Sequence, residues 1–255
     1  MTHPYFQDAR HPRVLAHRGL VPAAGEDAPL WENTAASFAA AHAAGVEYIE
    51  TDCQMTADGD VVLFHDSTLQ RLTGDERAVS ALRTRELSAI FADHGGLLTV
   101  ADALDAFPEI RFNIDVKTPA AAEPIGPLLA AHTHRVLLTS FSERNRRAAL
   151  ASVLRAGAGI RPATSAGRSV ILALRMLSWL RLSPARALRA VDAVQIPERH
   201  RGIPLFTPAL VRAAHRCGTE VHVWTVNDPR DMVRLVAAGA DGIVTDRADL
   251  ALRTI

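Results

Sequence analysis

The sequence predicts an α/β fold in which eight parallel strands close into a (β/α)8 barrel. Short runs rich in valine and isoleucine alternate with longer alanine-, leucine- and arginine-rich segments of helical period, the pattern of a parallel α/β protein. The 255 residues match the length of about 250 that such a barrel commonly uses as one domain. No G-x-G-x-x-G motif follows the first strand, so nothing favours an open sheet with a dinucleotide-binding crevice.

Strands and helices are expected to alternate along the whole chain. The expected strands are 13–17, 47–53, 111–116, 135–140, 158–163, 193–196, 220–226 and 242–245. The expected helices are 34–44, 80–91, 100–107, 120–132, 143–156, 168–181, 184–190, 207–217 and 228–238. Thr34 is a residue type that caps helix starts, and Gly45 and Gly239 stand where helices should end. No linker or low-complexity run divides the chain, so residues 1–255 are expected to form one TIM-type barrel domain.

One segment interrupts the alternation. "IETDCQMTADGDVVLFHD" contains two strand-like runs separated by Asp58-Gly59, a dipeptide favoured in tight hairpin turns. The few intervening residues are too short for a parallel crossover, which needs a dozen or more. We therefore expect residues 61–65 to return antiparallel, with a two-residue turn that places Asp52 opposite His65. A β-hairpin and a small helical insertion thus follow the second barrel strand.

Composition excludes several classes of partner and location. The 28 acidic and 28 basic residues balance, so no overall field attracts nucleic acid, and no nucleic-acid partner is expected. Cys53 and Cys217 are too few for a disulfide framework or a cysteine-rich metal site. The start of the sequence lacks the pattern of a secretory signal. The longest apolar stretch, "SVILALRMLSWLRL", is interrupted by arginines and is shorter than a membrane span. We expect a cytoplasmic protein without a transmembrane segment.

Three acidic residues are expected at the mouth of the barrel. Glu50 and Asp52 lie two apart at the end of the second strand, and Asp115 lies near the end of the third. Side chains two apart share a face of a strand, and barrel active sites form at the carboxyl ends of the strands. Three neighbouring carboxylates are costly to assemble without a divalent cation. Oxygen ligands favour Mg²⁺ or Ca²⁺ as that cation.

Two cations are expected beside these acids. Arg18 follows the first strand, and Lys117, the only lysine in the chain, follows the third. An arginine fork and a compact ammonium both suit a phosphate group. Lys117 is alternatively a buried counter-ion to a carboxylate. Glu32 either orients Arg18 or belongs to the entrance of the following helix.

Two histidines complete the constellation. His17 ends the first strand and His65 ends the returning arm of the hairpin, each beside a charged residue. Histidine is a natural general acid and base near neutral pH. Asp246 ends the last strand and either supports this site or caps the closing helix. The combination indicates metal-assisted chemistry on a phosphoester.

Seven motifs in order resemble the glycerophosphodiester phosphodiesterase family from about residue 14 to residue 250. They are "AHRG", "ENTAASF", "YIETDCQMTADGDVVLFHD", "STLQRLTG", "NIDVK", "VHVWTVND" and "GADGIVTDRADL". The resemblance implies a (β/α)8 barrel that hydrolyses a glycerophosphodiester to glycerol 3-phosphate and an alcohol. It implies a metal held by Glu50, Asp52 and Asp115, acid and base roles for His17 and His65, phosphate contacts from Arg18 and Lys117, and a pocket wall at Trp224.

The sequence departs from the family pattern at two places. The family more often has glutamate at the position of Asp115, and the shorter side chain is expected to loosen that metal contact or admit a water. Trp31 replaces the usual proline before "ENT". It follows a long loop, "VPAAGEDAPLW", which we expect above the mouth, where it affects which alcohol fits.

Alternatives remain open at this point. A lysophospholipase D-like enzyme acting on lysolipids and a non-catalytic barrel that binds phosphoesters are both compatible with the motifs. Trp224 lines the pocket or fills the barrel beside His222, which we expect in the core. The segment 168–181 is apolar nearly all round, unlike an ordinary outer helix. It contacts an acyl chain or a membrane surface, or it packs in the barrel wall or in a dimer. No particular oligomeric state is predicted.

Overall fold

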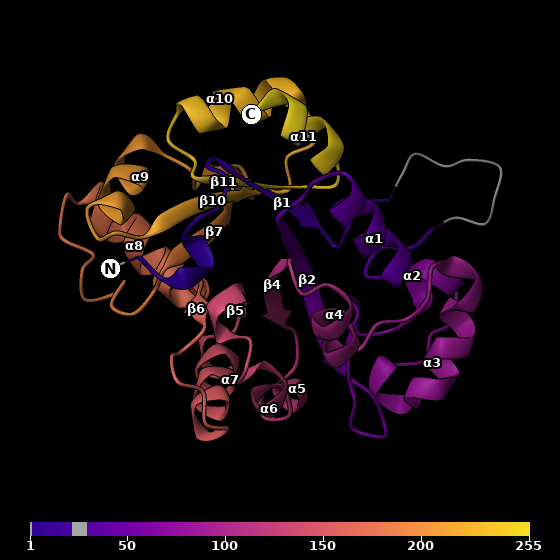
Figure 1. Cartoon of the computed structure of the whole chain (residues 1–255). Coiled ribbons are helices and arrows are strands. Elements are labelled where there is room, and N and C mark those ends of the chain that lie inside the picture. Colours follow the sequence, from indigo (N-terminus) through magenta and orange to yellow (C-terminus); the bar gives the residue numbers. More distant parts are fainter. Residues whose placement is uncertain (1, 22–29) are drawn as a thin grey trace.

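The structure, a computed structural model that describes residues 2–21 and 30–255, is an eight-stranded parallel barrel surrounded by helices (Figure 1). Hydrogen bonds link neighbouring strands from β6 through β5, β4, β2, β1, β11 and β10 to β7. A parallel bridge between Ser165 and Ala193 joins the two ends of this path. The barrel strands are β1 (Arg13–His17), β2 (Tyr48–Met55), β4 (Arg111–Val116), β5 (Val136–Thr139), β6 (Ala163–Thr164), β7 (Ala193–Pro197), β10 (Glu220–Trp224) and β11 (Gly242–Thr245). The predicted (β/α)8 fold is confirmed.

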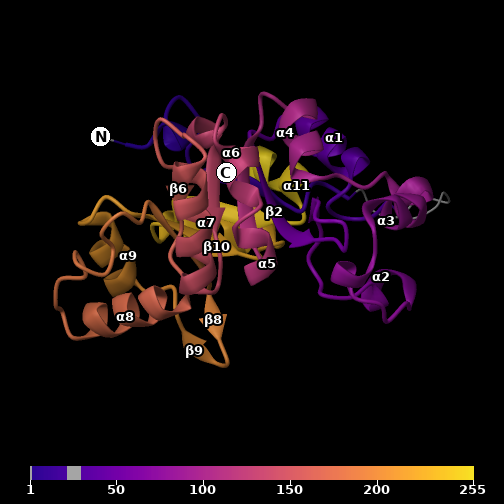
Figure 2. The same cartoon turned by 90° about the horizontal axis from the view of Figure 1, so that it is seen from below.

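Helices cover the outside of the barrel (Figures 1 and 2). They are α1 (Ala35–Ala43), α4 (Val100–Ala106), α5 (Pro119–Ala122), α6 (Ile125–Leu129), α7 (Glu143–Arg155), α8 (Arg168–Trp179), α9 (Pro208–His215), α10 (Pro229–Ala237) and α11 (Ala248–Thr254). Short 3-10 helices are η1 (Pro4–Phe6), η2 (Val79–Ala81), η3 (Ala92–His94) and η4 (Thr133–Arg135). Thr34 caps α1 through its side chain, as its residue type predicts. Across residues 2–21 and 30–255, every helix is too short or too polar to traverse a bilayer.

The insertion after β2 has a small core of its own. It contains β3 (Val61–Leu63), which pairs with β2, and the helices α2 (Gln70–Thr73) and α3 (Thr84–Phe91). The two helices lie to one side of the barrel (Figure 1). Trp31 packs here, edge-on to Phe91 and stacked on His94. Burying this apolar cluster fixes the insertion beside the barrel mouth. The predicted hairpin and helical insertion are thus present. Most of the long loop before Trp31, residues 22–29, lies outside the described residues.

The predicted register of the hairpin was wrong by one residue. Cys53 pairs with Leu63 and Met55 with Val61, so the backbone NH of Phe64, not that of His65, meets the carbonyl of Asp52, at 2.9 Å. The turn is a longer loop over residues 56–60, closed by a hydrogen bond from the Thr56 NH to the Asp60 carbonyl. The side chain of Thr56 donates to Asp58 and accepts from the Asp60 NH. These side-chain contacts favour the longer loop over the two-residue turn.

Three other elements differ from their predictions. Residues 184–190 form turns instead of a helix, because a short stretch becomes helical only where packing supports it and most of these side chains are exposed. The expected strand 158–163 is reduced to β6 at residues 163–164, since Pro162 offers no NH for a strand ladder and the residues between Gly157 and Pro162 form no regular structure. Pro124 divides the expected helix 120–132 into α5 and α6. A hairpin of β8 (Arg199–His200) and β9 (Ile203–Pro204) was not predicted.

A buried polar column fills the barrel interior below the mouth. Arg13 forms two hydrogen bonds of 2.7 Å with the carboxylate of Glu220, which also meets Nε2 of His222 at 3.0 Å. His222 is fully buried, as predicted. These contacts lower the pKa of Glu220 to about 2, although burial alone would raise it. The column supports the strands whose opposite ends carry the site.

Candidate active site

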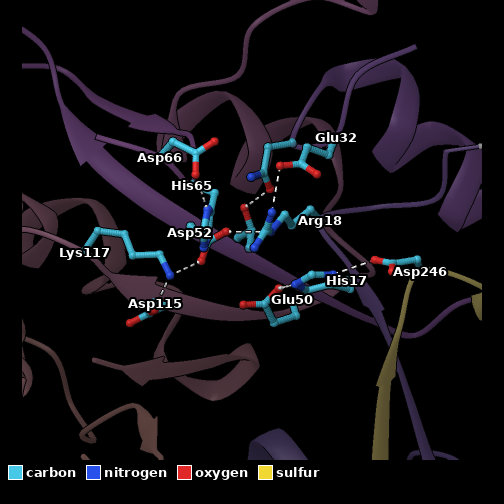
Figure 3. A network of polar contacts seen from close by, with 12 residues as sticks. His17, Arg18, Glu32, Glu50, Asp52, His65, Asp66, Asp115, Lys117 and Asp246 are labelled. Atoms are coloured by element: carbon cyan, nitrogen blue, oxygen red, sulfur yellow. Dashed lines mark hydrogen bonds and ion pairs between the residues drawn. The ribbon is translucent and has the colours of Figure 1, made fainter. Parts of the chain in front are cut away.

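One cavity at the carboxyl ends of the barrel strands contains eight of the nine predicted site residues. Its lining includes His17, Arg18, Glu50, Asp52, His65, Asp115, Lys117 and Trp224. Glu32 does not line this cavity. Figure 3 shows how the polar members converge from different strands and from the insertion. The spatial grouping expected from the strand ends is therefore present.

Parallel strand register brings the three acids together. Glu50 of β2 lies beside His17 of β1, and Asp52 of β2 lies directly beside Asp115 of β4. Because alternate residues of a strand share a face, Glu50 and Asp52 point to the same side of β2. The three acids thus belong to two adjacent strands, with Asp52 and Asp115 at one level and Glu50 two residues before Asp52.

Lys117 bridges two of these acids. Its Nζ lies 2.7 Å from Oδ1 of Asp52 and 2.7 Å from Oδ2 of Asp115 (Figure 3). Burial alone would lower the pKa of Lys117, but the two carboxylates outweigh burial and raise it. Lys117 is therefore an ammonium that acts as a counter-ion, the alternative that the sequence left open. An ammonium has three donors, so one remains beyond these two contacts.

The acids carry more negative charge than their neighbours balance. Burial, and then the charge of Asp52, raise the pKa of Glu50 well above its usual value. Burial also raises the pKa of Asp115 despite the opposing effect of Lys117. In the described part of the chain, Oε2 of Glu50 and Oδ1 of Asp115 are buried without a hydrogen-bond donor. Such oxygens, in a cluster with excess negative charge, fit a hard divalent cation.

The three acids, as placed in the structure, do not surround a single metal position. Among residues 2–21 and 30–255, no three histidine, cysteine, aspartate or glutamate side chains are placed to hold a metal ion together. Lys117 occupies the space between Asp52 and Asp115. The donor set thus suits Mg²⁺ or Ca²⁺, while the ligand roles of Glu50, Asp52 and Asp115 stay predictions.

Arg18 is held by its backbone and by two carboxylates. Its Nε lies 3.1 Å from Oδ2 of Asp52, and its guanidinium donates to Oε1 of Glu32 at 2.8 Å. The φ of Arg18 is 60°, a left-handed conformation that is costly for a residue with a side chain. At Gly19, with φ of 90°, a Cβ would lie 2.6 Å from Oγ of Ser37, so only glycine fits this turn. Glu32 thus contacts Arg18, one of the two interpretations open from the sequence.

The imidazole of His17 is oriented by Asp246. Nδ1 of His17 lies 2.6 Å from Oδ1 of Asp246, and Asn227 donates to the other oxygen of that carboxylate at 2.7 Å. Burial alone would raise the pKa of Asp246, but the hydrogen bonds from His17 and Asn227 lower it. Nε2 of His17 faces Glu50, 3.9 Å from Oε2. Asp246 therefore belongs to the site and orients His17 so that Nε2 is directed toward Glu50.

A second imidazole is oriented from the insertion. Nδ1 of His65 lies 2.7 Å from Oδ1 of Asp66, whose other oxygen accepts from Nε of Arg71 at 2.6 Å. Arg71 of α2 also contacts Glu32, which holds Arg18. The prediction did not include Asp66 and Arg71. Asp66 was detectable as the neighbour of His65, whereas the contacts of Arg71 depend on loop geometry that no periodicity reveals.

An apolar wall closes another side of the cavity. The ring of Trp224 lies edge-on to the ring of Phe141, with 5.9 Å between their centroids. Phe141 is 40% exposed, and Ile171 of α8 also lines the cavity. Trp224 therefore lies in the pocket wall, while His222 two residues earlier is in the core. The mouth thus has a charged side for a phosphate and an apolar side for another part of a ligand.

The arrangement of these residues agrees with comparisons of the whole sequence. The sequence model of the glycerophosphoryl diester phosphodiesterase family matches residues 17–250, a range that contains every residue of the site. The chain belongs to this family. Members of the glycerophosphoryl diester phosphodiesterase family are phosphoric diester hydrolases, and this chain is accordingly an enzyme of that class.

Relatives of the family resemble the chain over nearly its whole length. A "probable glycerophosphodiester phosphodiesterase 2" of Mycobacterium tuberculosis is 39% identical, over 93% of this chain and 88% of its own length. A glycerophosphodiester phosphodiesterase of Caldanaerobacter subterraneus is 26% identical over 95% and 97%. Mouse "Lysophospholipase D GDPD1" is 26% identical over 92% and 83%.

Solved structures share the fold. A glycerophosphodiester phosphodiesterase from Galdieria sulphuraria, described as putative, superposes with a TM-score of 0.73 at 19% identity, over 95% of this chain and 96% of that one. A phosphodiesterase of Oleispira antarctica, solved with the product sn-glycerol-3-phosphate, superposes with a TM-score of 0.70 at 20% identity, over 96% of each chain. At these identities the likeness concerns the barrel architecture alone.

Proposed function

We propose that this enzyme hydrolyses glycerophosphodiesters to glycerol 3-phosphate and an alcohol, with a divalent metal ion and two histidines at the barrel mouth. The observation that carries the proposal is the pairing of two imidazoles, each bound through Nδ1 to an aspartate, at a mouth that also contains three adjacent acids. Glycerophosphodiesters are favoured as substrates because the family and the relative of 39% identity carry that name.

The two histidines exchange the protons of the reaction. Asp246 and Asp66 engage Nδ1 of His17 and His65, so Nε2 is the nitrogen available to a substrate in each ring. Hydrolysis needs a base that takes a proton from the attacking hydroxyl and an acid that gives one to the departing alcohol oxygen. Two imidazoles that are engaged through Nδ1 leave Nε2 for these two roles.

Cationic residues bind the phosphate. Arg18 and Lys117 already contact Asp52, and each has further N–H donors for phosphate oxygens. Glu50, Asp52 and Asp115 are the residues that would hold Mg²⁺ or Ca²⁺. When bound, such an ion neutralises phosphate charge and favours ionisation of a hydroxyl nucleophile.

A lysophospholipase D-like activity is the second candidate. It is favoured by the apolar wall of Phe141, Ile171 and Trp224 beside the charged part of the mouth, because such a wall suits a substrate with a long apolar group. A relative of 26% identity carries that name. A non-catalytic barrel is disfavoured by the family and by the intact set of histidines and acids. The cytoplasmic location and the single-domain organisation expected from the sequence stay predictions.

A substrate panel tests the proposal. Short glycerophosphodiesters and lysophospholipids are incubated with the enzyme, and released glycerol 3-phosphate or lysophosphatidic acid is measured. We expect release of glycerol 3-phosphate that EDTA abolishes and that added Mg²⁺ or Ca²⁺ restores. Activity confined to lysolipids would transfer support to the second candidate, and undiminished activity in EDTA would remove the metal from the proposal.

A variant separates the metal from the substrate. Asp115→Asn removes one carboxylate charge at almost constant size, so we expect weaker binding of Mg²⁺ or Ca²⁺ in calorimetric titration without substrate. Asp105→Asn, on α4, is the matched control. Identical titrations of the wild type and Asp115→Asn would contradict ligation by Asp115.

A further inference from the structure

Helix α8 carries its apolar residues on the outside. Leu172 is 64% exposed, Met176 59% and Trp179 71%, while Leu174 and Ser178 are buried. The exposed residues lie four and three apart, which places them in one stripe along the helix. An outer helix of a barrel ordinarily turns its polar side to water. Packing within the barrel wall, one explanation open from the sequence, therefore does not account for this stripe.

Neighbouring segments extend the stripe into a face. Leu180 and Leu182 follow α8 and are 48% and 54% exposed. Ile203 of the β8–β9 hairpin is 59% exposed, and a hydrogen bond of 3.2 Å from Arg175 to the carbonyl of Pro204 ties this hairpin to α8 (Figure 2). We call this surface the α8 face; it consists of Leu172, Met176, Trp179, Leu180, Leu182 and Ile203. Apolar surface gathered in this way indicates an interaction site.

The segment that carries most of the α8 face is cationic, although the whole chain is neutral. Residues 166–191 contain five arginines and no acidic residue. Within the described ranges, none of these arginines forms an ion pair; they are Arg168, Arg175, Arg181, Arg186 and Arg189. Exposed apolar residues with a tryptophan, in a segment that also carries unpaired arginines, are typical of segments that lie in the interface of an anionic bilayer.

The α8 face borders the active-site mouth. Ile171, on the same helix, lines the cavity. The guanidinium of Arg168 lies 4.8 Å from the ring centroid of Phe141, which lines the cavity too. A bilayer on the α8 face would therefore lie next to the apolar side of the mouth.

We propose that the α8 face docks the enzyme on an anionic lipid surface. Trp179 and the leucines enter the region between headgroups and acyl chains, and the arginines contact lipid phosphates. A second copy of this chain fits the face less well, because a two-fold contact would bring the same unpaired arginines together. The docking goes beyond the proposed reaction and does not depend on it, since binding to a lipid surface can be measured without turnover.

Vesicle flotation tests the docking. The wild type is mixed with vesicles of phosphatidylcholine alone or with added phosphatidylglycerol. We expect flotation with the anionic vesicles, weakened by high salt, and much less with the neutral ones. Trp179→Glu combined with Leu180→Glu should reduce bound protein at least about tenfold, because two carboxylates oppose both burial and the anionic surface.

Matched controls come from other outer helices. Leu154 of α7 and Val233 of α10 are 50% and 49% exposed, so Leu154→Glu and Val233→Glu each add one negative charge outside the α8 face. We expect both variants to float like the wild type. Circular dichroism and turnover of a short, water-soluble phosphodiester should be the same in all variants, which separates docking from folding and from the proposed function.

Two results would overturn the docking proposal. One is negligible flotation of the wild type with either vesicle, or flotation that the α8 variant retains. The other is a dimer, seen by light scattering in the wild type and lost in the α8 variant, without vesicle binding. That second result would assign the face to a partner copy instead.

Discussion

Nδ1 of His17 lies 2.6 Å from Oδ1 of Asp246, a contact between the end of the first barrel strand and the residue that follows the last one. β1 and β11 are neighbours in the closed sheet, so closure of the barrel brings the two residues together. The aspartate holds the imidazole with Nδ1 engaged and Nε2 directed toward Glu50. Closure of the barrel therefore also orients His17, a proposed catalytic group.

Asp246→Asn should lower turnover by about 10²-fold or more. An asparagine amide can donate to Nδ1 and thereby favour the tautomer in which Nε2 carries the proton, the wrong form for a base. The fold should be unaffected, because the aspartate is half-exposed. Steady-state kinetics on a short glycerophosphodiester measure the effect, with Asp249→Asn of α11 as the control. Equal turnover of both variants would show that Asp246 merely precedes α11.

Lys117→Met should destabilise the fold by about 3 kcal/mol or more, because it leaves Asp52 and Asp115 buried without their shared counter-ion. Urea denaturation measures the free energy of unfolding. The double variant with Asp115→Asn should recover part of the loss, since one of the two repelling charges is removed as well. No recovery in the double variant would contradict the counter-ion role.

Lys117→Arg tests how narrow this position is. The planar guanidinium cannot take the place of a compact ammonium between two carboxylate oxygens without moving them. We expect turnover to fall at least about tenfold, measured as glycerol 3-phosphate release. Full activity of Lys117→Arg would show that the site does not discriminate between the two cations.

Arg71→Met should affect activity more than stability. Its side chain is 47% exposed, so its ion pairs contribute at most about 1 kcal/mol to the free energy of unfolding. It nevertheless restrains Asp66, which orients His65, and we expect turnover to fall by about tenfold. Arg77→Met is a fitting control, because Arg77 is also half-exposed and pairs with Asp75 in the same insertion. If both variants were equally active, the contact of Arg71 with Asp66 would have no part in catalysis.

The lowered pKa of Glu220 predicts how the free energy of unfolding depends on pH. Its pKa is about 2 in the folded protein, compared with the usual 4.5. Because the pKa of Glu220 is lower in the folded than in the unfolded chain, the ionised carboxylate stabilises the fold above about pH 4.5. This stabilisation is lost as the pH falls from about 4.5 toward 2. We expect Glu220→Gln to cost about 3 kcal/mol at pH 7 and progressively less below pH 4.5. Urea denaturation across this range measures the difference, and a pH-independent difference would contradict the prediction.

Strand positions were predictable from the sequence, and with them most of the site. Valine- and isoleucine-rich runs mark strands buried on both faces, and Glu50, Asp52 and Asp115 share a mouth because alternation and parallel register fix where each side chain points. The same alternation places Trp224 and His222 on one face of β10, so it does not explain why one lies in the pocket wall and the other in the core; that difference comes from depth along the strand.

Features that depend on side-chain hydrogen bonds in loops were not predictable. The contacts of Thr56 shift the hairpin register by one residue. Arg71 stands on a four-residue helix whose direction no sequence pattern encodes. The contacts of Lys117 with two carboxylates depend likewise on distances that the sequence does not give. Asp246 became a partner of His17 only through barrel closure.

Turnover of histidine variants tests the central claim most directly. His17→Ala, His65→Ala and the control His42→Ala, an exposed position on α1, are compared for the rate of glycerol 3-phosphate release from a short glycerophosphodiester with added Mg²⁺. We expect His42→Ala to match the wild type and each of the other two to lose at least about 10²-fold with an unchanged circular dichroism spectrum. Rates within tenfold of the wild type for His17→Ala or His65→Ala would contradict catalysis by this pair.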